Sequence, residues 1–304
     1  MKVLLKNSVN TLLNFPNVND VQIFVKREDE LHKIISGNKY RKLKYNILHA
    51  KNKNYEGLIS FGGAYSNHIA ALAYAGKVNN LKTIGLIRGE EISNKFTTNP
   101  TLKYARECGM NFEFITREIY KKRNTISFTM QIKNKYPNYY ILPEGGSNLL
   151  GVKGCEEILT AKDKNFDYIC CAVGTGGTFS GIINSSGMNQ QIIGFSSISK
   201  QFLLNDISKF VNKNNWKLTD KFSFNGYAKI NNELVNFMNE FYKFHNIKLD
   251  PIYTSKLFYG VVNKMKNNYF KPKSKVLVIH TGGLQGVEPM NRFLLMNKLN
   301  TINY

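Results

Sequence analysis

The feature that most constrains the fold of this chain is a series of short, apolar, β-rich runs, each followed by a Gly, Ser or Asn turn and then by a helix-like segment. Continuous apolar strands that alternate with helices are typical of parallel sheets with both faces covered. The sequence therefore predicts an α/β protein with eight or more strands, in one sheet or two. The runs are VQIFVKRED at 21–29, GLISFGG at 57–63, KTIGLIRGE at 82–90, NFEFITRE, YYILPEGG, DYICCAVGTGG, QIIGFSSIS and KVLVIHTGG.

Composition leaves room for such a fold and narrows the class of protein. The 304 residues are 42% hydrophobic, enough for one large domain or two moderate ones. No run approaches the roughly 20 apolar residues that cross a bilayer, and the first residues do not read as a secretory signal. The cysteines lack CxxC or paired His spacing, which indicates reduced thiols in the cytoplasm and no metal site; they are Cys108, Cys155, Cys170 and Cys171.

The net charge of +21 allows two interpretations. It can serve binding to nucleic acid or to an anionic membrane. Alternatively it has no dedicated partner, because the excess is mostly Lys spread along the whole chain, while Arg, the better reader of phosphates and bases, is scarce. The even spread favours the second interpretation, with neither nucleic acid nor membrane as a partner.

Residues that follow the strands are the candidates for function, because ligands of open α/β sheets bind beyond the strands' carboxyl ends. In the segment SGNKYRKL at 36–43, Ser36 and Asn38 are candidate N-caps of a helix. Lys39 then falls in the first helical turn, where the helix dipole favours the neutral, nucleophilic amine that a Schiff-base lysine needs. Lys42 shares its face and can reach an anionic group of the same ligand. A Lys-rich helix start without a ligand is the alternative.

A second cluster, FGGAYSNH at 61–68, joins a strand to an Ala-rich helix. Ser66 or Asn67 caps that helix, and the exposed amides at its start suit a carboxylate or a phosphate. His68 then lines the same turn. The alternative is an ordinary strand-to-helix turn with a serine cap and a packing histidine.

A third cluster, GTGGTFSG at 174–181, directly follows the strand YICCAV. Its glycines let the backbone approach a ligand, and Thr175 and Thr178 add hydroxyl donors, as in a phosphate cradle. The dinucleotide pattern G-x-G-x-x-G fails because Phe179 takes the place of the third glycine, and no Walker lysine follows. The segment therefore predicts a site for a single phosphate group.

A fourth cluster, HTGG at 280–283, ends the strand KVLVI. Thr281 can hydrogen-bond a ring nitrogen, or it can be a simple turn threonine, and His280 is expected to have a buried strand-end role. One ligand accounts for all four clusters. A phosphate, an aldehyde, a ring nitrogen and an attached amino acid carboxylate are the features of pyridoxal 5'-phosphate with its substrate.

Six segments resemble, in this order, one family: the 1-aminocyclopropane-1-carboxylate deaminases and D-cysteine desulfhydrases, within the tryptophan-synthase-β-like (type II) pyridoxal-phosphate enzymes. They are SGNKYRKL, FGGAYSNH, LPEGGSNLLGVKG, GTGGTFSG, LDPIYTSK and HTGG. The resemblance covers roughly residues 20 to 290. The resemblance implies two three-layer, parallel-sheet domains with the cofactor cleft between them. The larger comprises residues 1–47 and 156–304, and the smaller, inserted one residues 48–155. A cytoplasmic homodimer acting on a small amino acid is also implied.

The resemblance further implies roles for single residues. Lys39 matches the Schiff-base lysine, and Lys42 matches the lysine that contacts the phosphate. Tyr253 matches the first of two active-site tyrosines, so that Lys39, Ser66 and Tyr253 are the candidate catalytic residues. The phosphate loop corresponds to Gly174, Thr175, Gly176, Gly177 and Thr178. The substrate carboxylate is expected at Ser66, Asn67 and His68, of which Asn67 also meets the phenolic oxygen of the cofactor.

The chain departs from the family pattern at four positions. Met290 stands where the second tyrosine is expected, Asn291 where deaminases carry a Glu on the pyridine nitrogen, Thr281 where they have Leu, and Tyr65 where Gln is usual. A neutral partner on the ring nitrogen suits simple β-elimination, so the expected reaction is D-cysteine desulfhydrase-like and gives pyruvate, ammonia and sulfide. The alternative is the opening of 1-aminocyclopropane-1-carboxylate to 2-oxobutanoate and ammonia. A remote alternative, supported only by the charge, is a basic nucleic-acid-binding protein.

Overall fold

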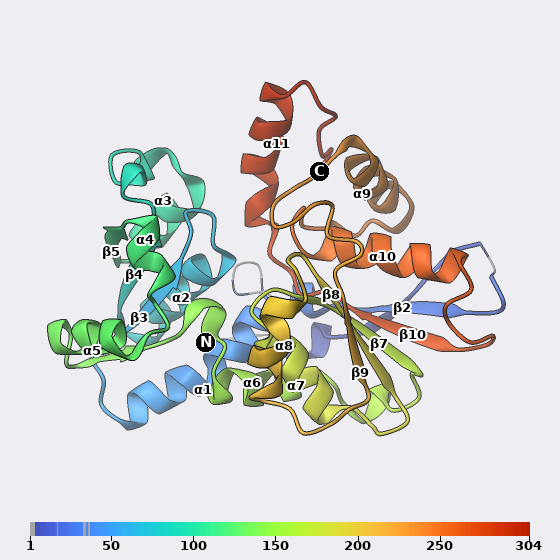
Figure 1. Ribbon diagram of the computed structural model, residues 1–304, viewed down its shortest axis with the longest axis horizontal. Helices are drawn as coiled ribbons and strands as arrows, with labels where there is room; N and C mark the ends of the chain where they lie inside the picture. The colour runs from blue at the N-terminus through green and yellow to red at the C-terminus, as the bar shows by residue number, and fades with distance from the viewer. Residues whose placement is uncertain (1–3, 17, 33–34, 36) are drawn as a thin grey trace. The chain divides into compact units, whose positions relative to one another are not determined.

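The structure, a computed structural model, describes residues 4–16, 18–32, 35 and 37–304 (Figure 1). These residues divide into two compact units, one formed by residues 39–154 and the other by residues 4–38 together with 155–304. Each unit contains one sheet.

The larger unit holds a six-stranded sheet in the order β1-β2-β10-β7-β8-β9. Neighbouring strands are parallel, except that β1 pairs antiparallel with β2. The strands are β1 (Asn10–Leu13), β2 (Gln22–Lys26), β7 (Tyr168–Val173), β8 (Gln191–Ser196), β9 (Trp216–Thr219) and β10 (Lys275–Ile279). The helices of this unit are α7 (Gly177–Ser185), α8 (Gln201–Ser208), α9 (Asn232–His245), α10 (Thr254–Lys266) and α11 (Val287–Met296).

Alternate residues of the central strand β7 face opposite sides of this sheet. Cys170 packs with Val278 and Ile193 of the neighbouring strands and with side chains of α9, α10 and α11. Cys171 packs on the other side with Ile279 and with side chains of α7 and α8. Helices on both faces explain why every position of the strand is apolar, and both thiols are buried, as expected.

The smaller unit holds a four-stranded parallel sheet in the order β5-β4-β3-β6. On one face, Ile84 of β4 clusters with Tyr120 of α4 and Ile132 of α5. The preceding residue, Thr83, meets Gly76 of α2 on the other face, where a Cβ on that glycine would lie 2.3 Å from the threonine methyl. The strands are β3 (Gly57–Gly62), β4 (Lys82–Arg88), β5 (Met110–Ile115) and β6 (Tyr139–Ile141). The helices are α2 (Asn67–Asn79), α3 (Pro100–Glu107), α4 (Arg117–Lys121) and α5 (Ile126–Lys135).

The chain passes from one unit to the other within α1 (Asn38–Asn52) and α6 (Leu149–Glu156). Short 3-10 helices lie at Leu5–Asn7, Glu28–Leu31, Glu90–Ile92, Phe96–Thr98, Glu144–Gly146, Ala161–Asp163 and Leu284–Gly286. In the part of the chain that the structure describes, every helix is too short or too polar to span a membrane.

Each of the eight runs singled out in the sequence contains a strand, which confirms the predicted α/β fold with parallel sheets. Two further strands, β1 and β9, were not indicated by the sequence, and they form the two edges of the six-stranded sheet. Edge strands meet solvent on more sides than central ones, so their residues need not be apolar throughout.

A buried ion pair ties the end of β2 to the segment before β7. The Lys26 ammonium lies 2.8 Å from a carboxylate oxygen of Asp163, and both side chains are almost fully buried. The same carboxylate accepts hydrogen bonds from Asn10 and from the backbone and hydroxyl of Thr160. Every oxygen of the pair therefore has partners, which a buried charge requires.

Lys26→Met should lower the free energy of unfolding by about 3 to 5 kcal/mol, because it leaves the Asp163 carboxylate buried without its cation. Urea titration followed by circular dichroism measures this loss. Lys209→Met is the matched control in the same unit, since its ion pair with Asp206 is exposed and its loss should cost less than about 1 kcal/mol. Equal effects of the two substitutions would contradict the account.

Candidate active site

The glycine segment after β7 leads directly into a helix start with open amides. Gly176 has φ of +83° and precedes α7, and no side chain caps this helix. The first backbone donor into the helix is Ser180, whose amide bonds the carbonyl of Gly176 at 2.9 Å. The amides of the three residues before it have no acceptor within the helix. This end of α7 is therefore built to receive an anion.

Three segments of the larger unit meet beside the start of α7, where the strands β7 and β10 end. The side-chain amide of Asn38 donates to the Thr178 hydroxyl at 2.9 Å. Gly37 has φ of +55°, and a Cβ there would lie 2.1 Å from the carbonyl oxygen of Thr281. Only glycine fits this close approach. Lys39 is the next residue along the chain, and it falls in the first turn of α1, as predicted.

The N-cap predictions for α1 did not hold in full. Asn38 is the first residue of α1, and its side chain is engaged with Thr178. Ser36 lies outside the described residues.

Tyr253 lies against the same glycine segment. A Cβ on Gly174 would come within 3.0 Å of the Tyr253 ring and 3.2 Å of its hydroxyl oxygen. The tyrosine immediately precedes α10, and Asp250 fixes this turn: one carboxylate oxygen accepts from the Tyr253 amide at 2.8 Å, and the other accepts from the amide and hydroxyl of Thr254 at 2.8 Å. Asp250 was not among the predicted site residues, although an Asp-Pro turn with Thr four residues later is the signal of such a cap.

His280 has the buried strand-end role that the sequence suggested. Its Nε2 donates to the carbonyl of Lys248 at 2.8 Å, and its Nδ1 accepts from the amide of Gly282 at 3.2 Å. Both ring nitrogens are therefore used in holding the turn that carries Thr281, which is itself buried.

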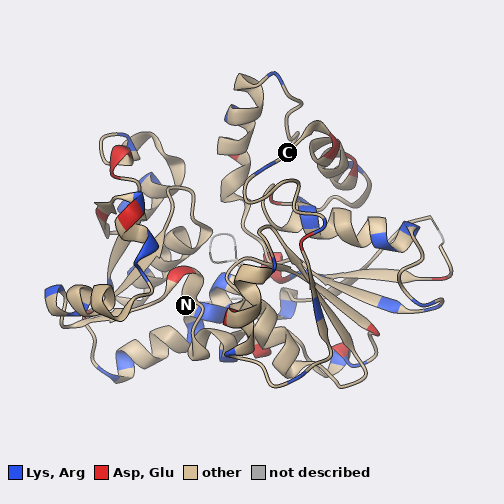
Figure 2. Ribbon diagram, viewed as in Figure 1, with Lys and Arg blue, Asp and Glu red and all other residues tan. Residues whose placement is uncertain are grey.

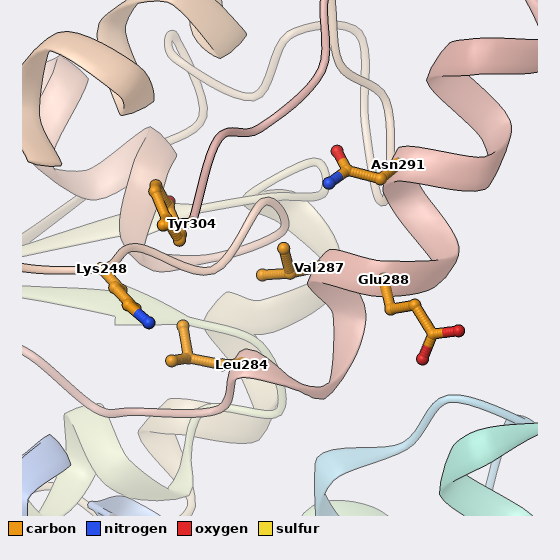
Figure 3. A pocket seen from close by; sticks show the side chains of 6 residues that line it. All are labelled: Lys248, Leu284, Val287, Glu288, Asn291 and Tyr304. Carbon is orange, nitrogen blue, oxygen red and sulfur yellow. The ribbon is translucent and has the colours of Figure 1, made fainter.

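Met290 and Asn291, the departures from the family pattern, serve packing. Met290 belongs to the hydrophobic cluster of the larger unit. Asn291 holds the last residues of the chain, since its amide donates to the carbonyl of Ile302 and its oxygen accepts from the Ile302 amide, both at 2.8 Å. Asn291 also lines a cavity of about 440 Å³ with Lys248, Leu284, Val287, Glu288 and Tyr304 (Figure 3). None of the predicted site residues lines this cavity.

In the smaller unit, Ser66 caps α2 as predicted, and its hydroxyl oxygen accepts from the amide of Ile69 at 3.3 Å. The turn before it is tight, because a Cβ on Gly62 would lie 2.8 Å from that oxygen. Asn67 is the first residue of α2. Ser66 and Asn67 thus stand side by side at a helix start, the place expected of carboxylate-binding groups.

His68 is buried, and its surroundings hold it neutral. Its Nε2 lies 2.8 Å from the hydroxyl of Ser60, which itself donates to the carbonyl of Leu142. The proton between them must then come from Nε2, so Nδ1 carries a lone pair, and Nδ1 is buried with no hydrogen-bond partner in the described structure. Burial, followed by the nearby charges of Lys39 and Lys42, lowers the pKa of His68 to about 3.

Lys42 is buried and joins α1 to the segment after β6. Its ammonium donates to the carbonyl of Gly145 at 3.0 Å and to the hydroxyl of Ser147 at 2.9 Å. No local pattern predicts these partners, because they lie more than 100 residues away along the chain. Within the described residues, no three His, Cys, Asp or Glu side chains are placed to hold a metal ion.

Known proteins resemble this chain over nearly its whole length. The family model described as pyridoxal-phosphate dependent enzyme matches residues 6–282. A putative 1-aminocyclopropane-1-carboxylate deaminase of Thermotoga maritima is 31% identical over 297 residues, covering 90% of this chain and 92% of that protein. A bifunctional, mitochondrial D-cysteine desulfhydrase/1-aminocyclopropane-1-carboxylate deaminase of Arabidopsis thaliana is 30% identical over 305 residues, covering 90% of this chain and 75% of that protein. The solved structure of an ACC deaminase homologue has a TM-score of 0.78 at 25% identity, covering 95% of this chain and 93% of that one.

The neutral state of His68 should make stability depend on acid pH. In the folded chain His68 stays neutral down to a pKa of about 3, whereas in the unfolded chain it takes up a proton below about pH 6.5. The unfolded state then binds more protons, so the free energy of unfolding should fall by about 2 kcal/mol between pH 6.5 and 5 from this group alone.

Urea titrations of wild type and His68→Gln at several pH values measure this contribution. Glutamine keeps an N–H for Ser60 but does not titrate, so the stability difference between the two proteins should shrink below pH 6.5 and stay constant from pH 7 to 8. A difference that is independent of pH from 5 to 8 would show that folding does not lower the pKa of His68.

Proposed function

The chain belongs to the pyridoxal-phosphate-dependent enzymes, in the family of 1-aminocyclopropane-1-carboxylate deaminases and D-cysteine desulfhydrases, and we propose that it cleaves D-cysteine to pyruvate, ammonia and sulfide. One observation carries this choice: Met290, at the position of the family's second tyrosine, is packed in the core. Opening a cyclopropane ring that has no Cα hydrogen requires a nucleophile or base at the ring carbons. A buried methionine supplies neither.

The residues of the larger unit fit the cofactor's phosphate. At the start of α7, the open backbone amides can donate hydrogen bonds to an anion, and the positive end of the helix dipole stabilises its charge. The space at Gly174 and Gly176 holds no side chain. An added Cβ there would crowd Tyr253 and Ile207, respectively, at about 3.0 Å. When bound, pyridoxal phosphate supplies the conjugated ring that accepts the electrons of the amino acid's Cα–H bond.

Lys39 is the proposed covalent anchor of the cofactor and the base that takes the Cα proton at its amine once released. Its place next to Asn38, which is bonded to Thr178, supports this role. Lys42 is proposed to add positive charge near the phosphate, which the residues Gly174, Thr175, Gly176, Gly177 and Thr178 bind. Thr281 is proposed to meet the ring nitrogen as a neutral partner.

The remaining residues are proposed to orient the amino acid. Ser66, Asn67 and His68 receive its carboxylate at the start of α2. The neutral His68 contributes through its shape and not through hydrogen bonding, because its one N–H faces Ser60. Asn67 is also the proposed partner of the cofactor's phenolic oxygen. Tyr253 is proposed to lie beside the departing sulfur, where its hydroxyl can donate a proton.

The opening of 1-aminocyclopropane-1-carboxylate remains the second candidate. It is favoured by the names of the two relatives reported above, both of which include that deaminase. A role in nucleic-acid binding has less support, because Lys and Arg are scattered over helices, strands and loops of both units (Figure 2).

Lys39→Ala should abolish the visible absorbance of the purified protein and reduce turnover of D-cysteine by at least about 100-fold, since both anchor and base are lost. Absorbance spectra and a sulfide assay measure the two effects. Lys51→Ala is the matched control, because Lys51 lies in the same helix and is exposed. Full activity of Lys39→Ala would overturn the assignment.

Identification of the keto acid separates the two candidate reactions. Wild-type enzyme is supplied in parallel with D-cysteine and with 1-aminocyclopropane-1-carboxylate, and products are separated by chromatography. Pyruvate from the first and no 2-oxobutanoate from the second are expected. Efficient release of 2-oxobutanoate would reject the β-elimination proposal in favour of the deaminase.

A further inference from the structure

The segment between β9 and α9 has an unusual backbone. Phe224, Asn225 and Ala228 have φ of +52°, +66° and +57°, and Gly226 has φ of +122°. Non-glycine residues seldom adopt such angles, and each costs on the order of 1 kcal/mol or more. Tertiary contacts must therefore stabilise this segment in its observed conformation.

Lys256 holds it from α10. The side chain is buried, and its Nζ donates to the carbonyl of Ser223 at 2.8 Å and to the carbonyl of Gly226 at 2.7 Å. Burial lowers the pKa of Lys256 to about 8, against the opposing charge of Asp250. We call these two hydrogen bonds from Lys256 to Ser223 and Gly226 the clamp. A neutral amine still has two N–H groups for the two carbonyls, so the clamp is kept when Lys256 loses its proton.

The aromatic side chains of this segment have two kinds of surroundings. Phe222 and Phe224 pack edge-on against Tyr259, within the hydrophobic cluster of this unit. Tyr227 is instead 49% exposed. Its ring meets the Tyr253 ring edge-on, with centroids 6.1 Å apart and planes at 64°. The strained turn therefore keeps a half-exposed tyrosine against the ring that covers Gly174.

We propose that Tyr227 is a positioning residue, whose ring holds the Tyr253 side chain over Gly174, and that Lys256 is the clamp that presents it. An edge-on aromatic pair limits the rotation of both rings. Without Tyr227, the Tyr253 hydroxyl loses its fixed place beside the glycine segment. This assignment rests on the proposed function in one respect: the catalytic role of Tyr253 is taken from it.

Tyr227→Leu should lower kcat for D-cysteine by about 10- to 100-fold, because misplacing a reacting group by an ångström has effects of this size. KM and the visible absorbance of the bound cofactor should stay close to those of wild type. Tyr227→Phe keeps the ring and should retain wild-type kcat. Tyr269→Leu is the control: Tyr269 is 40% exposed and also pairs edge-on, with Phe270, which contacts Tyr168 at the opposite end of β7.

A second measurement needs neither cofactor nor turnover. Nitration of the cofactor-stripped protein by tetranitromethane, followed by peptide mass spectrometry, reports the accessibility of each tyrosine. Nitration of Tyr253 should be faster in Tyr227→Leu than in wild type, Tyr227→Phe or Tyr269→Leu. Lys256→Met should show the same increase and faster proteolysis between residues 220 and 230; if that variant does not fold, the Tyr227 variants carry the test.

If kcat and the rate of Tyr253 nitration are both unchanged in Tyr227→Leu, the inference is overturned. The proposed function still stands in that case, provided that the wild-type enzyme cleaves D-cysteine. Equal loss of kcat in Tyr227→Phe would also overturn it, since the hydroxyl and not the ring would then matter. If wild type cleaves no D-cysteine, the proposed function fails, and the nitration rates still decide whether Tyr227 holds Tyr253.

Discussion

The backbone of Gly37 lies so close to Thr281 that a single added carbon would come within 2.1 Å of its carbonyl oxygen, and the arrangement of the site depends on this contact. Together with the hydrogen bond from Asn38 to Thr178, it joins the start of α1 to the ends of β7 and β10. Lys39 follows Asn38 directly, so its backbone begins at a fixed point next to the residue that contacts Thr178. A lysine on a loose segment would sample many places, whereas this one starts from a backbone already ordered by folding.

The residues that depart from the family pattern have structural tasks of their own. Met290 of α11 packs in the core, and Asn291 holds the C-terminal segment through Ile302. Tyr253 is held by Asp250 at its backbone and, as we infer, by Tyr227 at its ring.

Much of the fold could be predicted because it follows from local patterns. Eight apolar runs indicated the buried strands, and Ser66 before an Ala-rich segment indicated a helix cap, which the structure has. The edge strands β1 and β9 were missed because four residues with mixed exposure give no clear period. Asn38 was predicted as an N-cap but is the first residue of α1, and its side-chain amide donates to Thr178, 140 positions away along the chain. Lys42 and Lys256 take their partners from tertiary contacts, which no sequence period encodes.

The central claim is that the Lys39 amine carries the cofactor, and chemical trapping tests it most directly. Wild-type enzyme loaded with pyridoxal phosphate is reduced with borohydride, digested and mapped by mass spectrometry. The account predicts one stable pyridoxyl group per chain, on the peptide that contains Lys39. A label on another lysine, or traces spread over the many surface lysines of this basic chain, would contradict it.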